Sequence, residues 1–441
     1  MDNFYAFEHA FQVSERGSHL LKRVREARTL LDQVSGTFVR SGELKQLLAA
    51  LSSDLRQLSD QAKTISDNVS LQEFTSGMQA QQYYHAEAIA ILEDAIRQRT
   101  VLRKPEETFV KDKTMGGFSL LAAYAAIERL TNYFVRTFFG ENYNSVQFCM
   151  TGLEHDFGAI PIDVLNRDVL VFLVPSVEVC RTRLWPGLAH EASHHRVILA
   201  DTVRPRSQAK FQRRMDAVVR DLASQVFSRT SQRLDRELRR ELILTQIGEI
   251  LSDTMSVLAV GPASPFSLGT IVSPQTETDG PMNEHPPLNC RVLFLYDVLL
   301  GEARTDGYRQ ELQSMRREWM AASRMTRGVR STYVQSYSRF LEEHRVELVS
   351  IALDHLIANH GNLYKEADWA NANALARSHF EEVPTGTNVM AVLNAPWARR
   401  WNTFPSISQV YHQRGEHIIR LREREHKGTG HVVRLVNTLL K

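Results

Sequence analysis

Residues 242–260 constrain the fold of this chain more than any other segment. The segment is largely apolar and long enough for a buried helix, yet it contains two charged residues, Glu249 and Asp253. Residues four apart lie on one face of a helix, so both carboxylates point the same way. Burying two unpaired carboxylates is costly, and a metal ion or a histidine would offset that cost. The alternative is a helix face at the rim of the core, bonded to Arg or Ser.

A second predicted helix, at residues 184–199, carries groups that suit this role. It has Pro186 in its first turn and contains the motif HEASH at residues 190–194. His190 and His194 share a face, so both imidazoles can reach one zinc ion, and Glu191 beside them can take a proton from a water molecule. A shuffled chain of this composition would contain such a motif about 4% of the time, so it needs support from elsewhere in the sequence. The alternative is a partly exposed helix with coincidental histidines.

The two helices together offer the groups that a catalytic zinc ion requires. Such an ion takes three protein ligands and keeps a fourth position open. We expect His190, His194 and Glu249 to be the ligands. Metal-bound histidines also need a carboxylate to hold their other ring nitrogen, and Asp253 is expected in that role.

These residues, in this order, resemble the gluzincin family of zinc metallopeptidases. Glu249 follows His194 by 55 residues, a gap closer to neprilysin-like than to thermolysin-like enzymes. Gly248 and the following Glu249-x-x-x-Asp253 resemble the glutamate motif of neprilysin. The likeness covers residues 165–295 and implies a zincin-like core. The strand predicted at residues 168–174 occupies the place of the family's upstream edge strand, although the family's Asn-Ala signature is missing.

The resemblance also implies roles for two residues further along the chain. Neprilysin-like enzymes carry a His and an Arg at the spacing of His285 and Arg291. It implies that His285 stabilises an oxyanion and that Arg291 donates to a substrate carbonyl or to the residues behind the metal. An ordinary loop histidine and a structural salt bridge are the alternatives. The implied chemistry is zinc-assisted hydrolysis, with Glu191 as the general base that passes the proton to the leaving amine.

Most of the remaining sequence has a helical pattern. Two N-terminal sets of apolar residues recur at alternating intervals of four and three, with a turn predicted at residues 40–43, and more helix is predicted at residues 78–99 and 115–139. This pattern predicts a helical hairpin or bundle, and a coiled coil that binds a partner or another copy is the alternative. The two sets are Leu20, Val24, Ala27, Leu31, Val34 and Phe38, and Leu44, Leu48, Leu51, Leu55, Leu58, Ala62, Ile65 and Val69.

We therefore predict a mainly α protein of the α+β type, built in three parts. Residues 1–112 form a coiled-coil-like helical region that ends in a linker at 104–113. Residues 113–300 form the zincin-like core with a small sheet, and residues 301–441 form a C-terminal helical region. Within the core, residues 262–290 are rich in Pro, Ser, Thr and Gly and are predicted as loop.

Composition narrows the range of partners. The formal net charge is +2, and the basic stretch at residues 203–240 has a helical apolar pattern, so a solvated helix face is favoured over a nucleic-acid site. Three widely spaced cysteines indicate a reducing compartment. With no signal-like start and no uncharged apolar run of about 18 residues, a cytoplasmic protein without a membrane segment is expected.

The expected function is zinc-dependent peptide-bond hydrolysis, by an endopeptidase acting on a specific intracellular protein. The cofactor is Zn²⁺, and the substrate is a protein or peptide. The N-terminal helices are a candidate surface for a protein partner. The alternative is a non-catalytic helical scaffold whose zincin core is structural or inactive.

Overall fold

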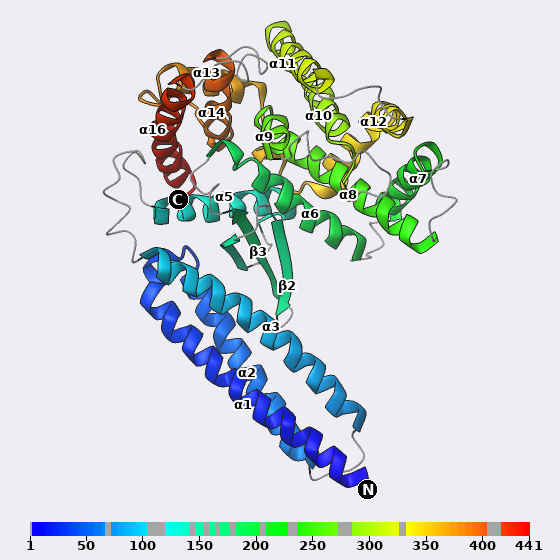
Figure 1. Ribbon diagram of the computed structural model, residues 1–441, viewed down its shortest axis with the longest axis vertical. Helices are drawn as coiled ribbons and strands as arrows, with labels where there is room; N and C mark the ends of the chain where they lie inside the picture. Colours follow the sequence, from blue (N-terminus) through cyan, green and yellow to red (C-terminus); the bar gives the residue numbers. More distant parts are fainter. Residues whose placement is uncertain are drawn as a thin grey trace.

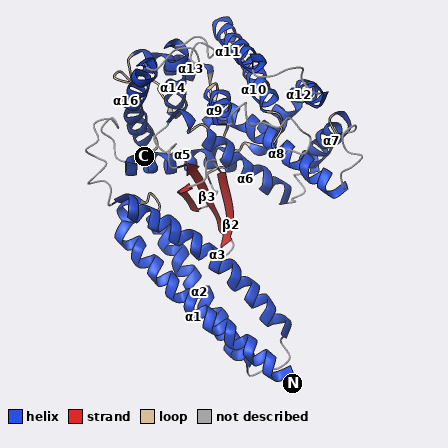
Figure 2. Ribbon diagram, in the orientation of Figure 1, coloured by secondary structure: helices blue, strands red, loops and turns tan. Residues whose placement is uncertain are grey.

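The computed structural model confirms that the chain is mostly helical (Figures 1 and 2). It describes residues 2–66, 72–103, 120–141, 146–152, 158–164, 167–175, 182–202, 209–227, 236–271, 285–325, 332–403 and 416–441. The predicted linker at 104–113 and the heptad position Val69 lie outside these residues. A long helical bundle extends away from a larger helical body, and a small sheet lies between the two (Figure 1).

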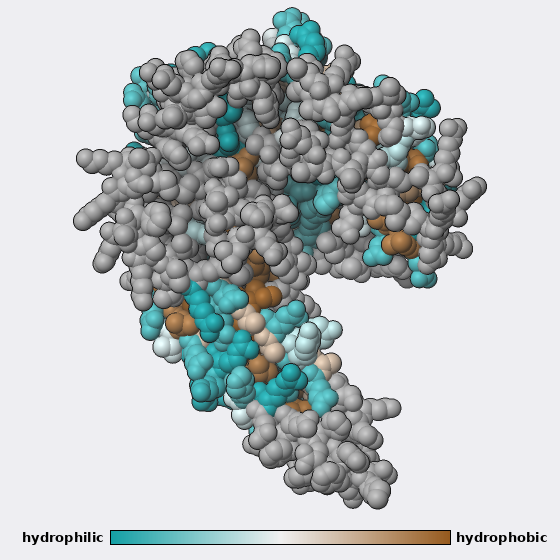
Figure 3. Space-filling model, viewed as in Figure 1, coloured by the Kyte–Doolittle hydropathy of each residue, from teal (hydrophilic) through white to brown (hydrophobic). Residues whose placement is uncertain are grey.

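Three helices form the bundle: α1 (Asp2–Val34), α2 (Ser41–Ser66) and α3 (Gln72–Arg103). The predicted heptad residues from Leu20 to Val34 and from Leu44 to Ala62 are all buried between them, which confirms the apolar seams. Helix α1 packs along both of the other helices. On the face seen in Figure 3, the described surface of the bundle is largely hydrophilic, with hydrophobic atoms in a narrow band. Such a surface is expected where each helix buries one stripe.

The sheet has three strands in the order β1-β3-β2: β1 (Val146–Gly152), β2 (Gly158–Val164) and β3 (Arg167–Pro175). Strand β3 is central and pairs parallel with β1 and antiparallel with β2. Side chains alternate between the two faces of a strand. Val169 and Val171 accordingly join the core of the bundle, while Leu170, Phe172 and Val174 join the core of the body. Because both faces are buried, β3 has the continuous apolar sequence that predicted it.

The body has one hydrophobic core, which contains residues from Ala123 to Val436 and continues across the boundary predicted near residue 300. Its helices are α5 (Leu120–Phe139), α6 (Gly187–Thr202), α7 (Ala209–Gln225), α8 (Arg236–Val260), α9 (Ala263–Ile271), α10 (Leu288–Glu302), α11 (Asp306–Met325), α12 (Thr332–Ile351), α13 (Glu366–Arg377), α14 (Val389–Thr403) and α16 (Glu416–Leu439). Short turns of 3-10 helix at η1 (Ser35–Thr37), η3 (Thr182–Leu184) and η6 (His360–Asn362), and a π-helical turn at η5 (Ala352–Leu356), complete the described helical elements.

Three predictions from the sequence are wrong in detail. The strand at 168–174 is central, not an edge strand; β2 is the edge that pairs antiparallel with it. Part of the loop predicted at 262–290 is helix α9, which tolerates Pro265 because the first turn of a helix does not use that N–H. The turn predicted at 40–43 comes earlier: Phe38 is extended, and α2 already begins at Ser41.

Helix α8 is the innermost helix of the site described below. By length and composition, its segment Glu237–Val260 is the one described helix that would also suit a membrane span, but 78% of the apolar window is buried inside the fold. Such burial is typical of a core helix. The helix ends at Val260. The next residue, Gly261, has a φ of +82°, a left-handed conformation that favours glycine.

We predict that Gly261→Ala destabilises the protein by about 2–4 kcal/mol. The new Cβ would lie 2.6 Å from Cγ of Tyr364 and would impose a strained φ at the end of α8. Gly248→Ala, in the interior of the same helix with no atom within 4 Å of its Cβ, should instead stabilise it by about 0.5–1 kcal/mol. Urea unfolding of both variants measures the two effects, and equal signs would contradict the prediction.

Candidate metal centre

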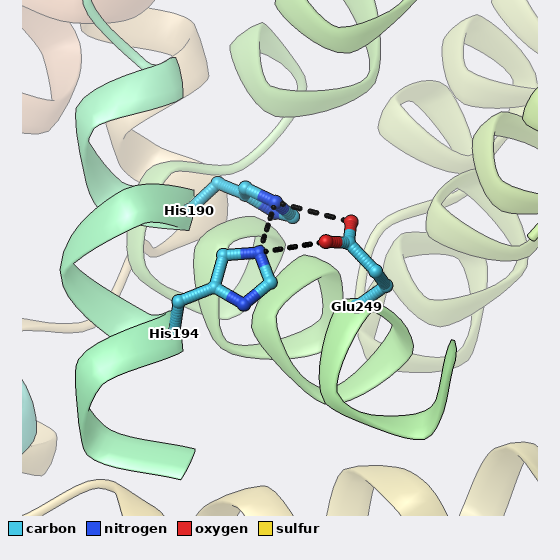
Figure 4. Close-up of side chains that lie close together, drawn as sticks. All are labelled: His190, His194 and Glu249. Atoms are coloured by element: carbon cyan, nitrogen blue, oxygen red, sulfur yellow. Dashed lines mark hydrogen bonds and ion pairs between the residues drawn. The ribbon is translucent and has the colours of Figure 1, made fainter. Parts of the chain in front are cut away.

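Helices α6 and α8 pack side by side and bring three potential metal ligands together (Figure 4). His190 and His194 project from α6 toward Glu249 on α8, and the candidate ligand atoms of the three residues all lie within 4.8 Å of one another. The two Nε2 atoms are 2.8 Å apart. Nε2 of His194 is 3.1 Å from one oxygen of Glu249, and Nε2 of His190 is 3.5 Å from the other. The three residues predicted as ligands therefore converge on one point.

The donor set fits zinc. A tetrahedral zinc ion with bonds of about 2.1 Å separates its ligand atoms by about 3.4 Å, and the observed separations span this value. Two imidazole nitrogens and one carboxylate are also a ligand set found in catalytic zinc sites. The side chain of Glu249 is 8% exposed and that of His194 is 25% exposed, so the cluster opens to solvent on the His194 side.

Asp253 and Arg291 support the cluster from the buried side. One oxygen of Asp253 lies 2.9 Å from Nδ1 of His190, the nitrogen that faces away from Glu249, as predicted for a carboxylate that orients a ligand. The guanidinium of Arg291 donates to both oxygens of Asp253, at 2.6 and 3.0 Å, and its Nη2 lies 2.9 Å from Glu249. Its side chain is only 3% exposed. Arg291 thus holds the two carboxylates in place, which matches the alternative of a donor behind the metal rather than a contact to a substrate carbonyl.

Electrostatics keep both carboxylates ionised. Burial alone would raise the pKa of Glu249, but the charge of Arg291 and the hydrogen bonds with His190 and His194 hold it well below its usual range. The pKa of Asp253 is lowered against its own burial by Arg291 and His190. Burial alone would lower the pKa of His190, but the nearby carboxylates of Asp253 and Glu249 outweigh it and raise the pKa to about 10. A cation at this point is therefore strongly favoured, whether it is a proton or a metal ion.

Glu191 and His285 lie next to the cluster. Glu191 follows His190 on α6; burial raises the pKa of its carboxyl, and the charges of His190 and His194 act against that shift. Nε2 of His285 is 3.6 Å from Glu249, and its side chain is 57% exposed, at the solvent side of the site. Six of the seven residues singled out in the sequence are joined by these contacts, and they come from α6, α8, α10 and the segment before α10. The seventh, Glu191, lies on α6 between the two histidines in sequence.

Two residues that the sequence analysis passed over fix α6 in position. The hydroxyl of Ser193 contacts the backbone oxygen of Ser252 on α8 at 3.1 Å. This contact joins α6 to α8 close to the candidate metal ligands. Arg196 donates to the backbone oxygens of His355 and Leu356, both at 3.1 Å, and so ties α6 to η5. Ser193 could have been noticed in the sequence because it is a small polar residue on the predicted buried face of the helix that carries the HEASH motif. The partners of Arg196 follow only from the tertiary fold.

We predict that Arg291→Met costs about 3–5 kcal/mol of stability in the presence of a chelator, because it leaves two buried carboxylates without their cation. Arg309→Met is the matched control: Arg309 pairs with Asp306, which is 88% exposed, so its loss should cost less than about 1 kcal/mol. Urea unfolding measures both. If Arg291→Met does not fold, Arg291→Lys should fold, because it keeps the charge. A similar small cost for Arg291→Met and Arg309→Met would contradict the assignment.

Comparison with protein-family models, with curated proteins and with solved structures finds no match to this chain. The interpretation of the cluster therefore rests on its own residues and geometry.

Proposed function

We propose that this protein is a zinc-dependent peptidase whose metal ligands are His190, His194 and Glu249. The observation that carries the proposal is the convergence of two imidazole nitrogens and a carboxylate, with Asp253 on the far nitrogen of His190. A structural ion-pair cluster would need the carboxylates and Arg291. It would not need two histidines whose Nε2 atoms face each other at 2.8 Å. The resemblance to the gluzincin motif order supports the same function.

Each nearby residue has a role in this proposal. Bound zinc would polarise a scissile carbonyl and lower the pKa of a water molecule toward neutrality. Glu191 takes a proton from the attacking water and gives it to the leaving amine, and its raised pKa suits a group that must both accept and release a proton. His285, on the solvent side, is positioned to donate to the oxyanion. Asp253 and Arg291 keep the ligands oriented.

The proposed substrate is a peptide segment of a particular intracellular protein. The bundle of α1, α2 and α3 extends away from the body and offers a long surface for a protein partner (Figure 1). The cytoplasmic location is part of this proposal. The alternative, a non-catalytic scaffold built around a structural zincin core, would use the same bundle.

Zinc content and hydrolysis together test the proposal. We expect about one zinc ion per chain in the native protein and in Glu191→Gln, and less than about a tenth of that in His190→Ala. Glu191→Gln should cleave a quenched-fluorescence peptide library at least ~100-fold more slowly than the native protein, because it keeps the site but removes the base. Plasma emission spectrometry and initial rates provide the two readouts.

The matched control is His360→Ala, which removes an exposed histidine in η6, outside the cluster. It should keep both zinc and activity. Absence of zinc from the reconstituted native protein would overturn the metal site. Zinc without hydrolysis of any library peptide would overturn the peptidase and favour the scaffold, and full activity in Glu191→Gln would remove Glu191 as the base.

A further inference from the structure

A cavity that opens to solvent lies in the C-terminal half of the body, lined by residues of α11, α13 and α14. Its volume is about 410 Å³, and none of its lining residues belongs to the metal centre. Small-molecule sites typically enclose about 300–1,000 Å³, so the cavity is large enough for a compact ligand. Its lining contains three charged residues, two aromatic rings and two amides: Glu311, Glu366, Arg377, Tyr308, Trp369, Asn373 and Asn402.

Glu311 supplies a negative charge that no cation of the described residues balances. Its side chain is half-buried on α11, and burial raises the pKa of its carboxyl. The nearby indole of Trp369 acts against this shift in pKa. Among the residues that the structure describes, Glu311 makes no ion pair. A half-buried carboxylate without an ion-pair partner among the described residues is a favourable contact for a cationic group of a ligand.

Arg377 supplies the opposite charge. It is exposed in the last turn of α13, and within the described ranges no carboxylate lies within ion-pair distance of it. Glu311 and Arg377 both line the cavity and form no ion pair with each other, so its lining carries charges of both signs. A ligand that carries both charges can satisfy both residues at once.

The other charged residue at the cavity is already satisfied by the protein. Glu366 accepts hydrogen bonds from the backbone N–H groups of Arg304 and Thr305, at 2.9 and 3.2 Å, at the start of α11. These contacts lower the pKa of Glu366 against the effect of its burial. It is therefore a structural helix cap, and Glu311 is the carboxylate left for a ligand.

Neutral side chains complete the lining. Trp369 is 2% exposed and Tyr308 is also buried, which gives the cavity rigid aromatic walls. The hydroxyl of Tyr308 is held by Tyr364 at 2.7 Å. Asn402 donates to Asn373 at 2.9 Å, so these two amides form one fixed polar edge. Aromatic rings beside a carboxylate favour an ammonium group and an apolar side chain.

We propose that this cavity binds a small zwitterion of the α-amino acid type. The ammonium group of the ligand pairs with Glu311, its carboxylate pairs with Arg377, and its side chain packs on Trp369. A free amino acid and a dipeptide share this chemistry and differ in the distance between their charges. The site is separate from the metal centre and does not depend on the proposed peptidase activity.

Isothermal titration calorimetry on the full chain tests the proposal. The probes are the twenty standard amino acids and the dipeptides Gly-Phe and Phe-Gly, each up to about 10 mM. Phenethylamine and 3-phenylpropionate, which each carry one of the two charges, complete the set. We expect saturable binding of at least one zwitterion, and at least about tenfold weaker binding of both single-charge analogues. The dipeptide arm distinguishes the free amino acid from a peptide as the natural ligand.

Variants locate the site. Glu311→Gln and Arg377→Gln should each weaken binding at least about tenfold, because each removes one charge-assisted contact. Glu318→Gln and Arg317→Gln, on the same helix as Glu311 but outside the lining, should bind like the native chain. His190→Ala should also bind normally, so the result does not depend on zinc. No saturable binding of any zwitterion overturns the proposal. The proposal is also overturned if phenethylamine binds as tightly as the zwitterions, or if Glu311→Gln and Arg377→Gln both bind with native affinity.

Discussion

The buried carboxylates of Glu249 and Asp253 are the constraint on which this fold depends. Their helix, α8, lies in the centre of the main core, where neighbouring positions such as Ile247 and Leu251 are fully buried. An uncompensated charge in such a place costs several kcal/mol. Helix α10 compensates with Arg291, and α6 compensates with His190 and His194. The three helices can therefore pack well in only one relative arrangement.

This arrangement divides the site into a fixed side and an open side. On the fixed side, Arg291, Asp253 and Nδ1 of His190 form a buried chain of contacts. On the open side, His194 and His285 reach solvent. The groups that hold a ligand in place thus lie on rigid helices, and the groups that would meet a substrate lie at the surface. Such a division keeps the ligand geometry independent of events at the open side.

The sequence predicts the site better than it predicts the sheet. The four-residue spacing places His190 and His194 on one face of α6, and Glu249 and Asp253 on one face of α8. Packing these two faces together is enough to bring the four side chains close to one another. Strand β3 was predicted because both of its faces are apolar, whereas β1 and β2 were not. Strand β2 contains Pro161, which weakens a strand pattern and is tolerated because β2 is an edge.

Other features depend on contacts that no local pattern encodes. The sequence left Arg291 with two roles, and only the position of α10 behind α8 distinguishes them. Glu311 and Arg377 have ordinary places in amphipathic helices, and they line one cavity because the tertiary fold brings residues of α11, α13 and α14 to the same place.

The two clusters of charged residues discussed above differ in how their charges are paired. In the candidate metal centre, the carboxylates contact Arg291 and the histidines, so the helices gain stability from contacts within the chain. In the C-terminal cavity, Glu311 is half-buried beside a neutral indole, and Arg377 lines the same space without meeting it. Among the described residues, no ion pair relieves the desolvation of Glu311. A cavity lined by both side chains favours a ligand that carries both charges over any single ion, because only the former can contact both residues.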